Sequence, residues 1–121
     1  MRKSSGFTLV ELVVTLVVVI IIAAIAVPRF IDLTSTGNQN ATNAVAASLT
    51  AVSANNFAVR TANSTAGSAV ANCSDVGPLL QGGLPSGYSI TSLAVGAGAS
   101  VTCTLHGPGS KTATFVAMGI A

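Results

Sequence analysis

The pattern of apolar and polar positions divides the chain into three stretches. Residues 7–27 are almost wholly apolar. From residue 28 to about residue 60 the pattern becomes amphipathic, with apolar positions recurring at helical spacings. Residues 88–118 hold short segments rich in β-branched and aromatic side chains, separated by Gly and Pro. The sequence therefore predicts a helical first half and a stranded second half.

The apolar stretch is long enough to cross a membrane. As a helix, residues 7–27 would cover roughly 30 Å, the thickness of the hydrocarbon core of a bilayer. Arg2 and Lys3 precede it, and the positive-inside rule then predicts a cytoplasmic N-terminus with the rest of the chain outside. A plain anchor fits this pattern. So does a secretory signal peptide cut near Ala23–Ala26. Neither explains Glu11, because a carboxylate in hydrocarbon is costly.

The amphipathic stretch is predicted to continue the same helix. We expect one helix from Phe7 to about Arg60, ended by the turn-forming residues 63–68. Thr34–Asn38 is a poor helix former, which predicts a bend or a frayed turn there. We expect Leu49, Val52 and Val59 to pack on a sheet. The positions with helical periodicity are Phe30, Leu33, Ala41, Val45, Leu49, Val52, Asn56 and Val59.

The C-terminal stretch predicts a small antiparallel sheet. The candidate strands are Tyr88–Val95, Ser100–Leu105 and Thr112–Met118, with hairpin loops at residues 96–98 and 106–109. Val101, Cys103 and Leu105 alternate onto one face of the middle strand. Three short strands alone would be marginally stable, so they must pack on the helix. The expected fold class is α+β, a long N-terminal helix, its first half transmembrane, packed against a small C-terminal antiparallel sheet.

The N-terminal residues carry a resemblance to a known family. The run Gly6-Phe7-Thr8-Leu9-Val10-Glu11-Leu12-Val13, after a short basic leader, resembles the signature of type IV prepilins and the related pseudopilins. The resemblance implies cleavage after Gly6 by a prepilin peptidase, which then methylates the amine of Phe7. Pro28 also matches a family position, whereas Ile20 stands where many members have Gly. It implies three parts: a leader at 1–6, a transmembrane and assembly half-helix at 7–28, and a pilin globular domain at 29–121.

Glu11 takes a physical role from this resemblance. After cleavage, Phe7 would carry a positive amine in or near the membrane, and two isolated charges there would each cost several kcal/mol. If Glu11 of one subunit pairs with the Phe7 amine of the next, both costs are removed and the axial register is fixed. The plainer interpretation is that Glu11 reaches the nearby interface or is protonated.

The charge composition argues against nucleic acid as a partner. Charged residues make up 7% of the chain, against roughly 25% in ordinary soluble domains. Without residues 1–6, three basic and three acidic side chains balance, so the net side-chain charge is zero. A neutral chain rich in small residues indicates no direct nucleic-acid binding and favours packing against copies of itself.

The two cysteines, Cys73 and Cys103, are interpreted as a disulfide. The predicted topology places both outside the cytoplasm, where disulfides persist. A disulfide in the C-terminal region also resembles the pilin pattern. Free thiols and a metal site are the alternatives, although His106, expected as an exposed turn residue, is the sole histidine. We predict no metal, no cofactor and no catalytic residues, because no acid, base and nucleophile form a plausible set.

Three functions fit these observations. We favour a structural subunit of a type IV pilus, made as a single-pass inner-membrane precursor with a cytoplasmic N-terminus and assembled into an extracellular fibre for adhesion, motility or DNA uptake. Its expected partners are other copies in a helical homopolymer, the prepilin peptidase and methyltransferase, the membrane, and the inner-membrane pilus or secretion machinery. The alternatives are a type II secretion pseudopilin or minor pilin, and an uncleaved single-span membrane-anchored binding domain.

Overall fold

The computed structural model describes residues 8–121, and of residues 28–32 it describes the backbone alone. Their contacts divide the chain into an N-terminal unit ending at Ser35 and a C-terminal unit, Thr36–Ala121. The helix α1 takes part in both units, and all other elements belong to the second. The elements are α1 Leu9–Ala62, the 3-10 helix η1 Cys73–Leu79, β1 Ser89–Ile90, β2 Ser100–Gly107, the 3-10 turn η2 Pro108–Ser110, and β3 Lys111–Met118.

The predicted long helix is confirmed within two residues at each end. It passes through residues 34–38 without interruption, so the frayed turn expected there is wrong, whereas the bend stays a prediction. Tertiary contacts start at this point, since the Gln39 side-chain amide donates to the Thr112 carbonyl at 2.9 Å. Within the helix itself, the Thr42 hydroxyl donates to the Asn38 carbonyl four residues earlier, at 2.7 Å. Packing of this kind overrides the weak intrinsic helix propensity of the segment.

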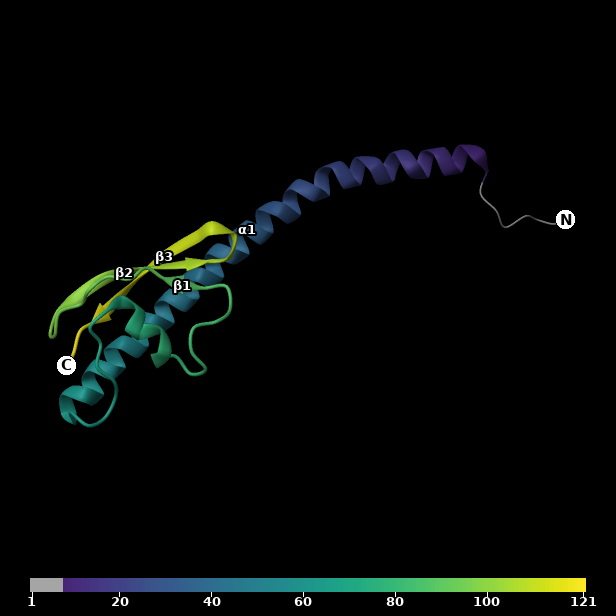
Figure 1. The fold of residues 1–121 in the computed structure, drawn as a ribbon. Helices are drawn as coiled ribbons and strands as arrows, with labels where there is room; N and C mark the ends of the chain where they lie inside the picture. Colours follow the sequence, from purple (N-terminus) through teal and green to yellow (C-terminus); the bar gives the residue numbers. More distant parts are fainter. Residues whose placement is uncertain (1–7) are drawn as a thin grey trace. The chain divides into compact units, whose positions relative to one another are not determined.

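The C-terminal unit contains a three-stranded antiparallel sheet in the order β1-β2-β3. Figure 1 shows β2 and β3 alongside the second half of α1. Cys103 of β2 lies opposite Phe115 of β3, and Leu105 lies opposite Ala113. Cys103, Leu105 and Phe115 are buried, whereas their neighbours in the strands are more exposed. The predicted alternation along β2 is therefore confirmed, and α+β is the fold class.

The core of this unit lies between α1, η1 and the inner face of the sheet. Leu49, Leu105 and Phe115 are its largest buried side chains. The Cys73–Cys103 disulfide lies in the same cluster. The core therefore joins segments that are far apart in the sequence. Its buried members are Ala46, Leu49, Val70, Cys73, Val76, Val95, Cys103, Leu105, Phe115 and Ala117.

The buried face of α1 differs from the predicted one. Leu49 is fully buried and Val52 packs against the core, as expected, but Val59 is 40% exposed. Leu33, also placed on the apolar face by its spacing, is 67% exposed. Three polar side chains take core-facing positions instead, namely Thr42, Ser53 and Asn56. Asn56 was among the positions predicted from helical periodicity, whereas Thr42 and Ser53 were not, because a search for apolar residues passes over small hydroxyl side chains.

Polar side chains of α1 cover the outer edge of β3. The Thr50 hydroxyl accepts a hydrogen bond from the Val116 amide at 3.1 Å. The Ser53 hydroxyl accepts one from the Met118 amide at 2.8 Å. Together with Gln39 at Thr112, they satisfy backbone groups that an edge strand otherwise presents to solvent. The helix thus holds the sheet by its edge as well as by its face.

The first predicted strand is largely wrong in its extent. Tyr88–Val95 was expected, yet β1 comprises Ser89–Ile90 only. After the Thr91 amide donates to the Thr104 carbonyl, the chain leaves β2. The Leu93 carbonyl then accepts from the Cys73 amide, and the Val95 amide donates to the Ala71 carbonyl. The backbone stays extended, but its partner is the segment leading into η1.

Local hydrogen bonds fix the segment between α1 and the sheet. Asn72 caps η1 by accepting from the Ser74 amide, and Asp75 bonds back to the Asn72 amide at 3.0 Å. The buried Asn56 exchanges two 2.8 Å hydrogen bonds with the backbone of Ser68. The Asn72-x-x-Asp75 spacing is a capping-box signal for a helical turn, although no helix was predicted here from the sequence.

One glycine sets how closely the hairpin approaches α1. At Gly107, a Cβ atom would overlap the hydroxyl of Thr42 and lie 3.0 Å from the Tyr88 ring. Only a residue without a side chain permits this approach.

Candidate functional site: the exposed apolar helix

The N-terminal part of α1 is an uncovered apolar surface. Leu9–Val27 has a mean hydropathy of 3.1, and by length and composition it can cross a membrane. Every large apolar side chain in it is exposed, from 47% at Val18 to 78% at Leu9. Leaving such side chains in water costs about 1.5–3 kcal/mol each. The described part of this chain does not cover them, so the surroundings that cover them must come from lipid or from another protein.

Glu11, the acidic residue of this segment, forms a capping box with Thr8. Its Oε2 atom accepts a hydrogen bond from the Thr8 amide at 2.9 Å, and the Glu11 amide donates to the Thr8 hydroxyl at 3.2 Å. The box satisfies two amides at the helix start, where a negative charge is also favoured. This role was not among those predicted for Glu11, although the Thr-x-x-Glu spacing signals it.

The geometry directs the carboxylate toward the start of the helix. Oε2 is bound next to Thr8, while Oε1 makes no hydrogen bond among the described residues. One carboxylate oxygen can therefore hold the cap while the other accepts a further donor. A cationic group at the helix start is the donor that would neutralise it.

Other residues of the predicted motif have limited structural description. Gly6 and Phe7, the predicted cleavage and methylation positions, lie outside the described residues. Pro28 lies within the bounds of α1, but its side chain is also outside the description. The roles assigned to these residues by resemblance stay predictions.

The predicted disulfide is present. The Cα atoms of Cys73 and Cys103 are 5.8 Å apart, and both residues are buried. The bridge joins the start of η1 to the middle of β2. It closes a loop with a sequence separation of 30, which contributes roughly 3–4 kcal/mol by the chain-entropy estimate. Free thiols and metal ligation, the alternatives left open by the sequence, do not describe these cysteines.

His106 lies in β2 and not in a turn, which corrects the sequence-based expectation. Its Nε2 atom is 2.7 Å from the Thr91 hydroxyl on the exposed face of the sheet. Within residues 8–121, no group of three His, Cys, Asp or Glu side chains is placed to hold a metal ion.

Two of the charged residues of the C-terminal unit are bonded to its own backbone. Arg60 donates to the carbonyl oxygens of Ala121 at 2.7 Å and Ala66 at 3.2 Å. Asp75 accepts from the Ala71 amide at 2.9 Å as well as from Asn72. With Lys111 as the third charged residue between 36 and 121, this unit presents a nearly neutral surface.

Comparisons with known proteins agree with the N-terminal motif. Residues 1–27 match the family described as prokaryotic N-terminal methylation motif. The chain is also similar to the type IV narrow pilus major component PilA5 of Thermus thermophilus, with 37% identity over 90 residues. This similarity covers 74% of this chain and 72% of that protein. No solved structure matches the chain significantly.

Proposed function

The chain belongs to the type IV pilin family, and from that premise we propose that it is the major structural subunit of a type IV pilus fibre. As a pilin it polymerises with other pilin subunits. The proposed fibre is extracellular and serves adhesion, motility or DNA uptake. The relative from Thermus thermophilus is a major component of a narrow pilus, which supports the major over the minor role.

The observation that carries the proposal is the uncovered apolar segment Leu9–Val27. In the precursor, lipid would cover these side chains. In the fibre, the same segments of other copies would cover them. A subunit leaving the bilayer without joining other copies would expose them to water, at about 1.5–3 kcal/mol for each large side chain. Release from the membrane is therefore coupled to assembly.

Glu11 supplies the register in this proposal. A carboxylate and an amine buried separately each cost several kcal/mol, and pairing them removes both costs. The capping box holds Glu11 at the start of its helix and leaves Oε1 able to accept a donor. The amine of Phe7 in a neighbouring copy is the proposed donor. An apolar helix alone can slide along its neighbours, whereas this pair selects one axial position.

Processing precedes assembly. We propose that the prepilin peptidase cuts between Gly6 and Phe7 and that the new amine is methylated. Arg2 and Lys3 hold the uncut leader on the cytoplasmic side of the inner membrane. Cleavage removes this pair of positive charges and creates the amine that Glu11 needs, so an uncut subunit lacks its assembly partner.

Shearing surface filaments from cells and measuring the intact mass of their main subunit tests the proposal. The expected mass begins at Phe7 and includes one added methyl group and the disulfide. An uncut mass beginning at Met1, or a cut after Ala26, would contradict it and would favour the uncleaved anchor or the signal peptide. The correct mass in a subunit scarce in filaments would indicate a minor pilin or a pseudopilin instead.

A further inference from the structure

The cover that α1 provides over the edge of β3 has a gap at Thr114. The Val116 and Met118 amides point away from β2, since they donate to Thr50 and Ser53 of α1. Thr114 pairs with Thr104, whose carbonyl bonds to the Thr91 amide on the β1 side. By strand alternation, the N–H and C=O of Thr114 point to the α1 side as well. Neither has a partner among the described residues.

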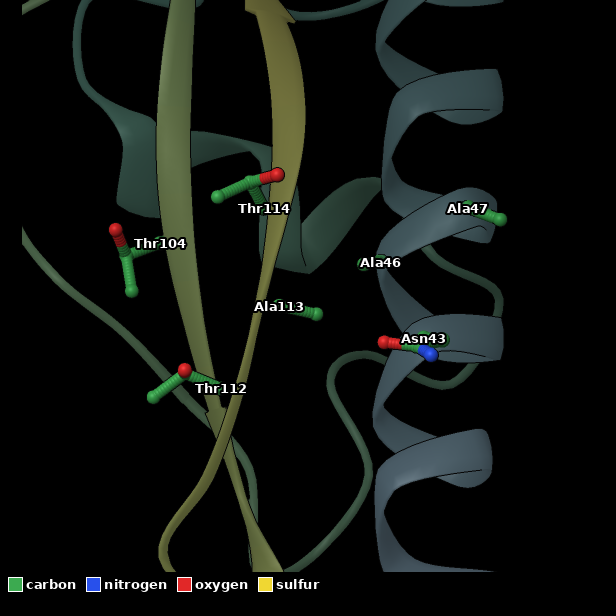
Figure 2. A pocket seen from close by; sticks show the side chains of 7 residues that line it. All are labelled: Asn43, Ala46, Ala47, Thr104, Thr112, Ala113 and Thr114. Carbon is green, nitrogen blue, oxygen red and sulfur yellow. The ribbon is translucent and has the colours of Figure 1, made fainter. Parts of the chain in front are cut away.

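A groove opens at this gap, between the bonds that Gln39 and Thr50 make to β3. It has a volume of about 600 Å³. Asn43, Ala46 and Ala47 line it from α1, and Ala113 with three threonines lines it from the sheet. Figure 2 shows Ala46 on the side of α1 that faces the sheet and the Ala113 side chain pointing toward it, whereas the Ala47 side chain points to the other side of the helix in this view. The small side chains of α1 at this point leave space beside the edge of β3. On either side of this space, the longer Gln39 and the Thr50 hydroxyl reach β3 and bond to it.

The chemistry of the groove fits a neutral peptide backbone. No lining residue is charged, so an anionic ligand would gain no ionic contact. An unpaired strand edge offers one donor and one acceptor in the geometry that an extended backbone matches. The Asn43 amide adds polar contacts, although its oxygen already accepts from Gln39 at 2.9 Å.

The size of the groove points to the source of that backbone. Seven residues line it, whereas a stable interface between free proteins takes about 20–30 residues on each side. A freely diffusing partner would bind to so small a surface only weakly. A segment that other contacts already hold nearby would occupy the groove, because its effective concentration is high.

We propose that the groove receives an extended backbone segment from a second copy of this chain, which pairs with the N–H and C=O of Thr114. This inference rests on the proposed function as a fibre subunit. The neighbour is held primarily through its helix, and the groove adds an orienting contact between the globular parts. The neutral surface of the C-terminal unit suits this role, since it offers a second copy few charges to desolvate.

A photo-crosslinking amino acid at position 47 of the full-length protein tests the contact. Ala47 is exposed and lines the groove, so the substitution leaves the core intact. Illumination of sheared filaments should give covalent dimers of this chain, linked to one recurring segment of the second copy. Detergent-dissociated subunits should give none. The matched control is the same amino acid at position 44, which is exposed on α1 outside the groove and should not link to that segment.

Backbone pairing is tested by Thr114→Pro against Thr114→Val. Proline removes only the N–H that points away from β2, and edge positions tolerate it. Valine keeps the N–H and the branched shape. Thr114→Pro filaments should release subunits about fivefold faster, the factor for one hydrogen bond, and Thr114→Val filaments should behave as wild type. Ala47→Arg, which fills the groove from an exposed position, should speed release where Ala47→Ser does not.

The outcomes separate the two proposals. Wild-type filaments with no filament-dependent dimers at position 47, and with release rates unchanged by Thr114→Pro and Ala47→Arg, would overturn the groove contact and leave the fibre intact. Crosslinks from position 47 to lipid or to another protein would overturn it too. A wild-type protein that forms no filaments would overturn both.

Discussion

Residues 9–27 and residues 36–62 of α1 are one helix in two different situations. In the first, every large apolar side chain is uncovered, and Glu11 is the only charged residue. In the second, the helix buries only Ala46 and Leu49 among its apolar side chains, together with the polar Thr42, Ser53 and Asn56. The first stretch can be covered only by lipid or another molecule, whereas the second packs against the sheet of its own chain.

The difference lies in what each stretch must recognise. A uniformly apolar surface accepts lipid or other helices and specifies little about register, so its single carboxylate carries the specificity. The second stretch meets one sheet, and its hydroxyls and amides match particular backbone groups of β3. Orientation is therefore fixed there by many small contacts.

The largest expected effect separates charge from capping at Glu11. Glu11→Ala should be inserted and cleaved but reduce fibre yield more than about tenfold, because the partner amine is left buried and unpaired. Glu11→Gln keeps a capping-box side chain but removes the charge, and it should fail equally. Quantitative blotting of sheared filaments against total subunit gives the yield.

Thr8→Ala is the reciprocal control, since it removes the capping hydroxyl and keeps the carboxylate. It should assemble far better than either Glu11 variant. If Glu11→Gln assembles normally while Glu11→Ala and Thr8→Ala both fail, the carboxylate acts as a helix cap and the charge-pairing proposal is wrong.

The disulfide tests the C-terminal unit alone. Replacing both Cys73 and Cys103 by Ser should lower its free energy of unfolding by roughly 3–4 kcal/mol. Denaturant unfolding of the detergent-solubilised protein measures this difference. Wild-type protein under reducing conditions should unfold at the same denaturant concentration as the double variant. Equal stability of oxidised and reduced wild type would contradict the expectation, while the apolar segment should insert in membranes either way.

Leu→Ala substitutions in the second stretch and just before it sharpen the comparison further. Leu49 is fully buried, so Leu49→Ala should cost about 3 kcal/mol of stability in the same unfolding measurement. Leu33 is 67% exposed, so Leu33→Ala should leave the stability of the isolated subunit nearly unchanged. Any effect of the Leu33 variant should be seen in filaments. Similar losses from both variants in detergent would show that the exposure of a leucine on α1 does not decide its contribution to the stability of the isolated subunit.

These two leucines also show what the sequence can reveal. Both lie on the predicted apolar face, because periodicity records which positions are apolar and not what covers them. The bounds of α1, the strands β2 and β3, and the disulfide were predictable, since each rests on local pattern or on compartment. Val59 was misplaced because its exposure depends on where the sheet ends along the helix.

The misreadings at β1 and at the Glu11 cap have different causes. The extended segment Tyr88–Val95 was identified, but strand pairing is a tertiary choice, and half of it pairs with the segment before η1. The capping boxes at Thr8 and Asn72 were readable from their spacing and were missed. Glu11 was interpreted mainly as a partner for a charge on another subunit, and its role in capping its own helix was not predicted.

The smallest predicted effect tests whether the edge of β3 is held by individual hydroxyls. Ser53 and Thr50 each accept one β3 amide, but Ser53 is fully buried and Thr50 is only partly so. Ser53→Ala leaves the partly buried Met118 amide without its partner and should cost about 1–3 kcal/mol. Thr50→Ala should cost less, because water can reach the exposed Val116 amide. Amide hydrogen exchange should then rise first at Met118 in the Ser53 variant and remain local to Val116 in the Thr50 variant. If both variants lose the same small amount of stability and amide exchange does not change, apolar burial alone positions the sheet. The polar side chains of α1 would then specify the register no better than its apolar first stretch does.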